Sequence, residues 1–170
     1  VVQSALNVDV KYLPNPAISN LRYTYEADSC SLYDEILRIL SNAEQYVFIS
    51  TFSVVGLENL PELTKAIKAA MLRGVQIKLF CRGMNHRTDH LSGCETLASL
   101  GCEIFGDSYN HSKGIVSEKS GMIFTANIDG YHGLTNGFEV GLVVNDNTRT
   151  ELESLHIHLI KTSIYKFEME

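Results

Sequence analysis

Hydrophobic residues follow two different spacings between residues 29 and 105. Three segments repeat them at the i, i+3, i+4 spacing of an amphipathic helix, and three β-prone runs alternate with these segments. The predicted helices cover Ser31–Ser41, Asn59–Gly74 and Cys94–Leu100. The predicted strands cover Tyr46–Phe52, Val75–Cys81 and Cys102–Phe105. This order predicts neighbouring parallel strands with right-handed crossovers, and it places the first of the three strands centrally in the sheet.

The pattern changes after residue 105. Strand-like runs at His111–Ser117 and Met122–Ala126 are separated only by the turn Glu118–Gly121, so these two strands are predicted to be antiparallel. Another strand is predicted over Phe138–Val144, followed by a helix over Thr148–Ile160. The pattern therefore predicts an α/β protein in which helices pack on a mixed β-sheet.

Three polar side chains are predicted to cap the helices. Ser31, with Asp34 three residues later, resembles a capping box, while Asn59 precedes a first turn that contains Pro61. Thr148 is expected to cap the last helix.

A chain of 170 residues is long enough for one domain with a single hydrophobic core. We expect residues 1–20, with Pro14 and Pro16, to form an extended lead-in or linker, and residues 21–170 to form a single domain. The chain begins at Val1 without an initiator methionine, so this domain could have been excised from a larger protein with further domains.

The net charge of −6 excludes a generally basic, nucleic-acid-coating surface, so an anionic substrate would need a local site. No apolar run approaches the ~20 residues of a membrane-spanning helix, and we expect no stable membrane association. The four cysteines lack the density of a disulfide scaffold. They favour a reducing compartment, so we expect the protein to be cytoplasmic.

The clearest candidate site lies on the predicted hairpin. His111 and Lys113 are two residues apart on one strand, which puts their side chains on the same face, ~7 Å apart along the chain. The returning strand brings Thr125 and Asn127 towards the same end. A nucleophile or base, a cation and neutral hydrogen-bonding groups in one place suit phosphoryl transfer.

These residues resemble the HKD signature of the phospholipase D superfamily, H-x-K-x4-D-x6-G-S-x-N. Glu118 stands at the position of the Asp, Phe124-Thr125 replaces Gly-Ser, and the interval to Asn127 is one residue shorter. We interpret Glu118, in a predicted turn, as structural. The order of elements over residues 30–145 also resembles that family. The resemblance implies an α/β fold with a phospholipase D-like mixed β-sheet flanked by helices on both faces.

The resemblance also implies roles in a reaction with a covalent phosphohistidine intermediate. His111 would be the nucleophile, Lys113 and Asn127 would bind the phosphate, and Thr125 would take the place of the Ser. Glu139 falls where the family has a carboxylate that orients the nucleophilic imidazole. Such a carboxylate fixes the tautomer and leaves the other ring nitrogen free to attack. This chemistry requires no metal and no other cofactor.

The family uses two such motifs in one active site, whereas this chain has one. No other histidine of the chain is followed two residues later by a lysine. The resemblance therefore implies a homodimer in which a two-fold axis brings both copies of His111 into one active site.

Further residues are candidates for binding substrate. Arg82, with Lys78 and Arg87, could flank a path for phosphates, and Tyr131 and His132 could influence the choice of substrate. Ordinary surface charge and a solvated loop are equally consistent with these residues.

Several histidines and cysteines raise the question of a metal site. Cys81, His86, His90 and Cys94 follow one another as metal ligands could, but neither paired spacing is that of a usual zinc finger. A free cysteine at the end of a buried strand behaves as a small hydrophobic residue, so we expect no metal site here. His156, like His158, is expected on the surface of the last helix.

The sequence thus predicts a metal-independent phosphodiesterase, in particular a nuclease that cleaves DNA or RNA at a homodimer interface. Nucleic acid is preferred over lipid because a lipid-cleaving enzyme would be expected to show an apolar membrane-docking face. One alternative is a phospholipase D-type lipid hydrolase or transferase. Another is a non-catalytic HKD-like module that dimerises a larger protein and binds nucleic acid.

Overall fold

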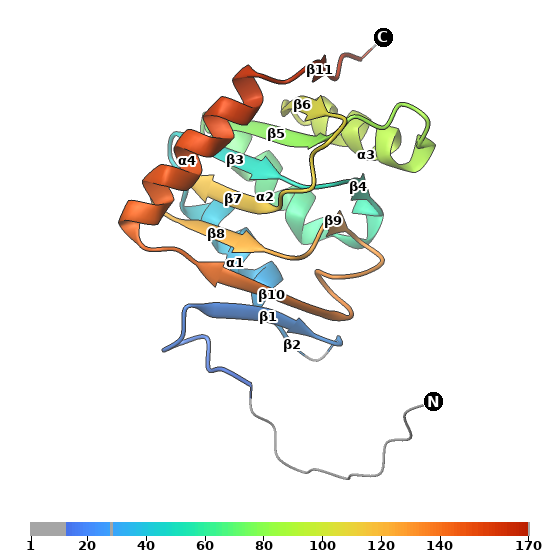
Figure 1. Ribbon diagram of the computed structural model, residues 1–170. Helices are drawn as coiled ribbons and strands as arrows, with labels where there is room; N and C mark the ends of the chain where they lie inside the picture. Colours follow the sequence, from blue (N-terminus) through green and yellow to red (C-terminus); the bar gives the residue numbers. More distant parts are fainter. Residues whose placement is uncertain (1–12, 28, 170) are drawn as a thin grey trace.

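A nine-stranded mixed sheet forms the centre of the fold in a computed structural model that describes residues 13–27 and 29–169 (Figure 1). Its strand order is β11-β6-β5-β3-β7-β8-β10-β1-β2. The strands are β1 (Leu21–Tyr25), β2 (Ser29–Cys30), β3 (Tyr46–Ser50), β5 (Gln76–Arg82), β6 (Glu103–Asp107), β7 (Gly114–Ser117), β8 (Gly121–Phe124), β10 (Phe138–Val143) and β11 (Tyr165–Lys166). A separate short pair joins β4 (Val54–Val55) to β9 (Ile128–Asp129).

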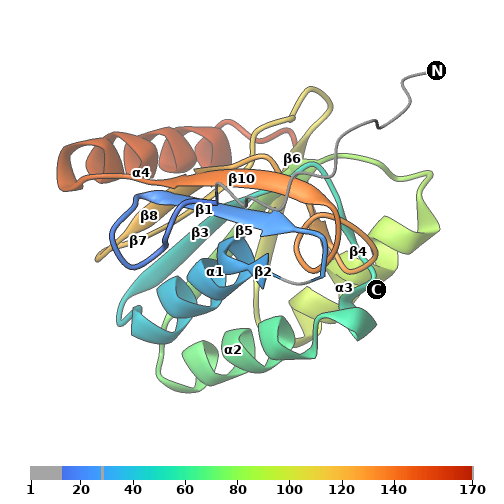
Figure 2. The ribbon, with the colours of Figure 1, turned by 90° about the horizontal axis from the view of Figure 1, so that it is seen from below.

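Helices cover both faces of the sheet. They are α1 (Ser31–Asn42), α2 (Pro61–Leu72), α3 (Thr88–Ser99) and α4 (Asp146–Lys161), with a 3-10 turn at Leu57–Asn59. Figure 2 shows α1, α2 and α3 on one side and α4 alone on the other. None of the helices in the described ranges is long and apolar enough to cross a membrane.

The predicted sheet topology is confirmed. β3 pairs in parallel with β5, and β5 pairs in parallel with β6. On its other side β3 meets β7 antiparallel, and β7 continues into the predicted hairpin with β8. β3 is therefore central, and the mixed character of the sheet begins beside it.

Several predicted boundaries were wrong. α3 begins at Thr88 rather than Cys94. Its first turn is largely polar, so the spacing of hydrophobic residues does not mark it as helical. β7 begins at Gly114 rather than His111, since the paired register with β8 runs from Gly114 opposite Ile123, and only the Lys113 carbonyl beyond it accepts from the Phe124 N–H. The short strands β1, β2, β4, β9 and β11 were not predicted.

The predicted helix caps were also wrong. Ser31 Oγ accepts a hydrogen bond from the Tyr23 N–H at 3.0 Å and so links α1 to β1 instead of capping. Asn59 ends the 3-10 turn, and α2 begins at Pro61 without a side-chain cap. α4 is capped by Asn145, whose Oδ1 accepts from the Thr148 N–H at 2.9 Å. Of the predicted lead-in, residues 1–12 lie outside the described residues.

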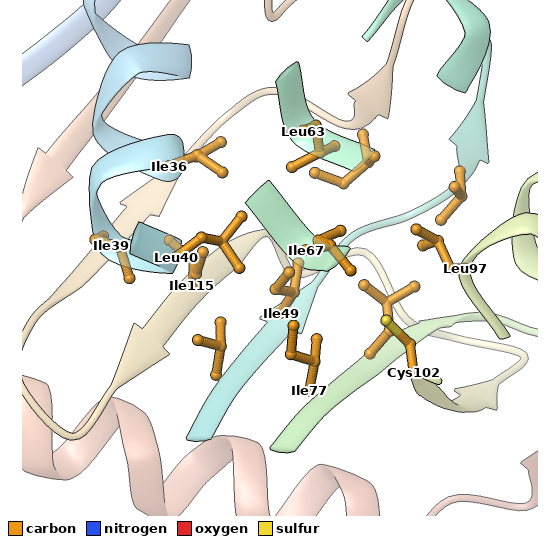
Figure 3. Packing of buried hydrophobic residues seen from close by; sticks show 14 of the residues in the cluster. Ile36, Ile39, Leu40, Ile49, Leu63, Ile67, Ile77, Leu97, Cys102 and Ile115 are labelled. Atoms are coloured by element: carbon orange, nitrogen blue, oxygen red, sulfur yellow. The ribbon is translucent and has the colours of Figure 1, made fainter. Parts of the chain in front are cut away.

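The main core lies between the sheet and helices α1 to α3 (Figure 3). Its buried side chains include Ile36, Ile39 and Leu40 of α1, Leu63 and Ile67 of α2, Leu97 of α3, and Ile49, Ile77 and Ile115 of the strands. A smaller cluster of Phe48, Val116 and Leu152 lies under α4. Alternate residues of the central strands therefore supply two cores, which explains their continuous hydrophobic runs.

His156 contradicts its predicted surface position. Its side chain is buried between α4 and β3, where Nδ1 lies 2.8 Å from the Leu152 carbonyl oxygen and Nε2 lies 3.1 Å from Ser50 Oγ. The carbonyl can only accept, so Nδ1 carries the ring hydrogen and Nε2 accepts from the hydroxyl. The helical pattern missed this because the ring satisfies both nitrogens inside the protein. His158 is exposed, as predicted.

This burial predicts a pH-dependent stability. Burial lowers the pKa of His156 below its usual 6.5, although the bond to Leu152 partly opposes this. His156 therefore binds a proton more readily in the unfolded chain than in the folded one. The stability that neutral His156 contributes is complete above about pH 6.5 and is lost as the pH falls towards the pKa of the folded state. We expect His156→Gln to flatten the fall of unfolding free energy below pH 6.5 by up to about 1.4 kcal/mol per pH unit, measured by urea unfolding. His158→Gln is the control, and an equally steep profile in both variants would contradict the prediction.

Candidate active site

The predicted site residues gather at one edge of the sheet, on the right in Figure 1, where β3 and β8 end and where β7 and β10 begin. The antiparallel pairing brings these ends together. Residues just before β7, just after β8 and at the start of β10 therefore become neighbours, although they are far apart in sequence.

His111 and Lys113 are in direct contact. Lys113 Nζ lies 3.0 Å from His111 Nδ1 and 3.0 Å from the His111 carbonyl oxygen. An ammonium group can only donate, so Nδ1 accepts and the ring hydrogen is on Nε2. His111 is exposed and Lys113 is half-buried. A bound phosphate could therefore reach both groups and would compete with the imidazole for the ammonium.

Phe52 also belongs to the site, although its residue type carries no chemical signal for it. The centroids of the Phe52 and His111 rings lie 5.2 Å apart, and the Arg82 guanidinium lies over the Phe52 ring, 5.1 Å from its centroid. The Phe52 N–H donates to Asn127 Oδ1 at 3.3 Å. Phe52 thus connects three of the predicted site residues, and only its position two residues after β3 could have identified it.

The segment before His111 is anchored by buried polar groups that were also not predicted. Asn110 donates from Nδ2 to the Thr51 carbonyl oxygen at 2.8 Å, and its Oδ1 accepts from the Ser112 N–H at 3.1 Å. Thr51 Oγ1 accepts from the Ile128 N–H at 3.0 Å, just after Asn127. The same residue therefore fixes both loops that carry the site, and His111 is exposed on a firmly held backbone.

Thr125 and Glu139 form the second part of the site. Thr125 Oγ1 donates to the Glu139 carboxylate and accepts from the Val140 N–H at 3.0 Å. Among the contacts of the described residues, Glu139 is thus paired with Thr125, while His111 is paired with Lys113. The role of Glu139 in orienting the imidazole remains a prediction.

The departures from the HKD signature have a structural explanation. Phe124 is the last residue of β8, and its side chain is buried in the main core. Successive side chains of a strand point to opposite faces, so Phe124 points away from the face of Thr125. Glu118 lies at the other end of β7 from His111, where its carboxylate accepts from the Glu44 N–H at 2.5 Å and the Tyr46 N–H at 3.3 Å. Although burial favours the neutral acid, these N–H groups hold the pKa of Glu118 below its usual value.

A hollow of about 360 Å³ opens beside the site, between the sheet and α4. His111, Lys113 and Thr125 line one side, and Leu155 of α4 and the buried His156 line the other. The hollow offers cations and hydroxyls on one wall and an apolar surface on the other.

The remaining candidates lie further out. Tyr131 and His132 are exposed, and Tyr131 Oη donates to Glu58 at 2.6 Å, which raises the pKa of the tyrosine. Lys78 and Arg87 are paired with carboxylates, at 3.7 Å to Glu103 and 2.6 Å to Asp89. Of the three predicted cations of the phosphate path, Arg82 is the one held beside His111 through Phe52.

Solved structures share this fold. A phospholipase D family member, Nuc from Salmonella typhimurium, superimposes with a TM-score of 0.68 at 15% identity, covering 88% of this chain and 97% of its own. NucT from Helicobacter pylori matches with a TM-score of 0.63 at 15% identity, covering 84% and 98%. TrmBL2, an archaeal chromatin protein with a novel mode of DNA binding, matches with a TM-score of 0.54 at 12% identity, covering 89% and 55%.

Sequence comparison identifies the family. No curated protein matches the chain. A family model described as the PLD-like domain of cardiolipin synthase matches residues 36–158, which is well over half of the 170 residues and includes every catalytic candidate. With its HKD-type residues at one sheet edge and the shared α/β fold, the chain belongs to the phospholipase D-like family.

Proposed function

We propose that this protein is a metal-independent phosphodiesterase that cleaves DNA or RNA through a phosphohistidine at His111. The contact between His111 and Lys113, with Thr125 in the same hollow and Asn127 bound to the neighbouring Phe52, is the observation that carries the proposal. One ring nitrogen of His111 attacks phosphorus and the bond to the leaving oxygen breaks. Water then attacks the phosphohistidine and restores the imidazole. Lys113 and Asn127 stabilise the charge on the non-bridging oxygens.

A second copy of the chain is proposed to supply the general acid. An apolar face of β1, β8 and β10 lies uncovered next to the hollow. In Figure 1, α4 crosses other parts of the sheet. This uncovered face consists of Leu21, Ile123, Phe138, Val140 and Leu142, with Tyr23 and Tyr25 beside them. It continues to Leu155 at the hollow. A two-fold contact here would bring one His111 as nucleophile near the other as acid.

The exposed groups around the edge support a nucleic-acid substrate. Tyr109 is 90% exposed two residues before His111, and Tyr131 is 53% exposed. Exposed aromatic rings and local cations such as Arg82 are typical of surfaces that bind single strands by stacking and charge. A cytoplasmic location is part of this proposal, because the four cysteines lack the density of a disulfide scaffold.

A lipid substrate is the second candidate, and the uncovered face favours it. A lipid-cleaving enzyme is expected to show an apolar membrane-docking face, and the structure has an apolar face beside the site. The matching family model is also that of a cardiolipin synthase domain. We assign the face to a second copy because the single motif needs a partner, and the substrate test separates the two candidates.

The test is cleavage of labelled single- and double-stranded DNA and RNA in excess EDTA, with phosphatidylglycerol and cardiolipin vesicles in parallel. The blank is a preparation in which His111 is replaced by alanine. Cleavage of a nucleic acid above this blank supports the proposal, and the preferred polymer defines the substrate. Turnover of the vesicles alone would replace it by the lipid candidate. If neither is cleaved but nucleic acid binds equally well to both proteins, the domain is a non-catalytic module.

A further inference from the structure

Cys81, His90 and Cys94 form a buried cluster, here called the dithiol cluster, outside the site described above. Cys81 is near the end of β5, and His90 and Cys94 are one turn apart on α3. Their exposed fractions are 4%, 2% and 2%. One ligand-type atom of each lies within 4.8 Å of the others, whereas His86 is exposed and takes no part.

The hydrogen bonds of His90 favour thiol chemistry over metal binding. The Val54 N–H donates to His90 Nδ1 at 3.0 Å, so the ring hydrogen of the neutral imidazole is on Nε2. Nε2 lies 3.6 Å from Cys94 Sγ and 3.8 Å from Cys81 Sγ. A metal ion on Nε2 would need that hydrogen on Nδ1, where Val54 offers a second donor instead of an acceptor.

Close packing holds this arrangement in place. A Cβ atom on Gly93 would lie 2.3 Å from the Val54 carbonyl oxygen, so only glycine allows α3 to approach β4 this closely. The His90 ring is therefore fixed with its N–H directed at the two sulfurs.

The two sulfurs have different surroundings. Cys81 Sγ donates to the Phe105 carbonyl oxygen at 3.5 Å, and an acceptor at this place favours the protonated thiol. Cys94 Sγ instead faces the N–H of His90 and the thiol of Cys81. The contact with the Cys81 thiol, and then the N–H of His90, lower the pKa of Cys94 despite burial, while the contact with Cys94 and burial raise the pKa of Cys81. Cys94 is thus the thiolate of the pair.

Small molecules have a route to the cluster. A cavity of about 290 Å³ is lined by Cys81, His90 and Cys94 together with the buried Met84 and the exposed Tyr165. This volume is large enough for a hydroperoxide, and the cavity is separate from the hollow at His111.

We propose that Cys81 and Cys94 are a redox-active dithiol that hydroperoxides oxidise to a disulfide. The Cys94 thiolate attacks the terminal –OH oxygen of the hydroperoxide. The O–O bond breaks, the attacked oxygen stays on Cys94 with its hydrogen as a sulfenic acid, and hydroxide or an alkoxide leaves and takes a proton from water. The Cys81 sulfur then attacks the Cys94 sulfur, and the departing hydroxide takes the Cys81 proton to form water. The sulfurs must approach to the ~2.05 Å of an S–S bond, which side-chain rotation over this short gap can provide.

The test treats the reduced, full chain with stoichiometric hydrogen peroxide, alkylates the remaining thiols and maps the peptides by mass spectrometry. We expect one disulfide, between Cys81 and Cys94, with the loss of two hydrogens. Cys81→Ser should stop at the sulfenic acid, so that dimedone labels Cys94. Cys102→Ser is the matched control: Cys102 is also buried, burial raises its pKa to about 12, and the variant should form the disulfide as the wild type does.

Two results would overturn the proposal. One is survival of both thiols under peroxide, or pairing through Cys30 instead. The other is one zinc ion per chain that remains after dialysis against EDTA and protects the thiols, which would make the cluster a metal site. Peptide mapping of the peroxide-treated wild-type protein decides between these outcomes even if Cys81→Ser does not fold.

Discussion

His111→Asn is expected to lower the rate of phosphodiester cleavage by at least about 10⁴-fold. In the proposed dimer the substitution removes both the nucleophile and the general acid, which act together in one site. Substrate affinity should change little, because Lys113, Asn127 and Arg82 remain. Single-turnover cleavage of a labelled oligonucleotide and fluorescence anisotropy measure the two quantities.

The exposed His158 provides the matched control, since His158→Asn changes the same residue type away from the sheet edge.

Mixing the wild type with His111→Asn tests whether the active site is shared between two protomers. After subunit exchange with an equal amount of His111→Asn, activity per wild-type chain should fall to about half, because mixed dimers lack one imidazole. Unchanged activity per wild-type chain would mean that each protomer acts alone.

Leu142→Lys is expected to convert the dimer into a monomer and to reduce cleavage by at least about 10²-fold. Leu142 lies in the middle of the uncovered face, paired across the sheet with Leu21 and Ile123. An unpaired ammonium buried at an apolar interface costs several kcal/mol, roughly a hundredfold or more in association. Sedimentation velocity and the cleavage assay measure the two effects.

Leu72→Lys is the control for this variant. Leu72 is 82% exposed at the end of α2, on the opposite side of the sheet, so its replacement should leave both dimer and activity intact. A Leu142→Lys protein that stays dimeric would show that the interface lies elsewhere. A fully active monomer would remove the shared active site altogether.

The central part of the fold was predictable because its strands are buried on both faces. Tyr46–Phe52 is a β-prone run, and Val75–Cys81 has apolar residues at alternate positions and then three in a row, while the helix between them has a clear hydrophobic stripe. The edge strands escaped prediction for the opposite reason. β2, β9 and β11 have two residues each, too few to show an alternating pattern, and tertiary pairing alone defines them.

The candidate site was partly predictable for a chemical reason. His111, Lys113, Thr125 and Asn127 stand out by residue type and spacing, and the hairpin that joins them is a local structure. The position of Phe52 against His111, and the tie from Asn110 to Thr51, depend on contacts between distant segments. His156 looked like a surface residue because a pattern of hydrophobic positions does not reveal a polar side chain whose partners are internal.

The segment from Thr51 to Val55 contacts both the candidate active site and the dithiol cluster. Phe52 packs on His111, and two residues later the Val54 N–H is bound by His90. Neither contact can shift by a residue without misplacing the other. Insertions and deletions should therefore be excluded from this segment in related sequences that keep both centres.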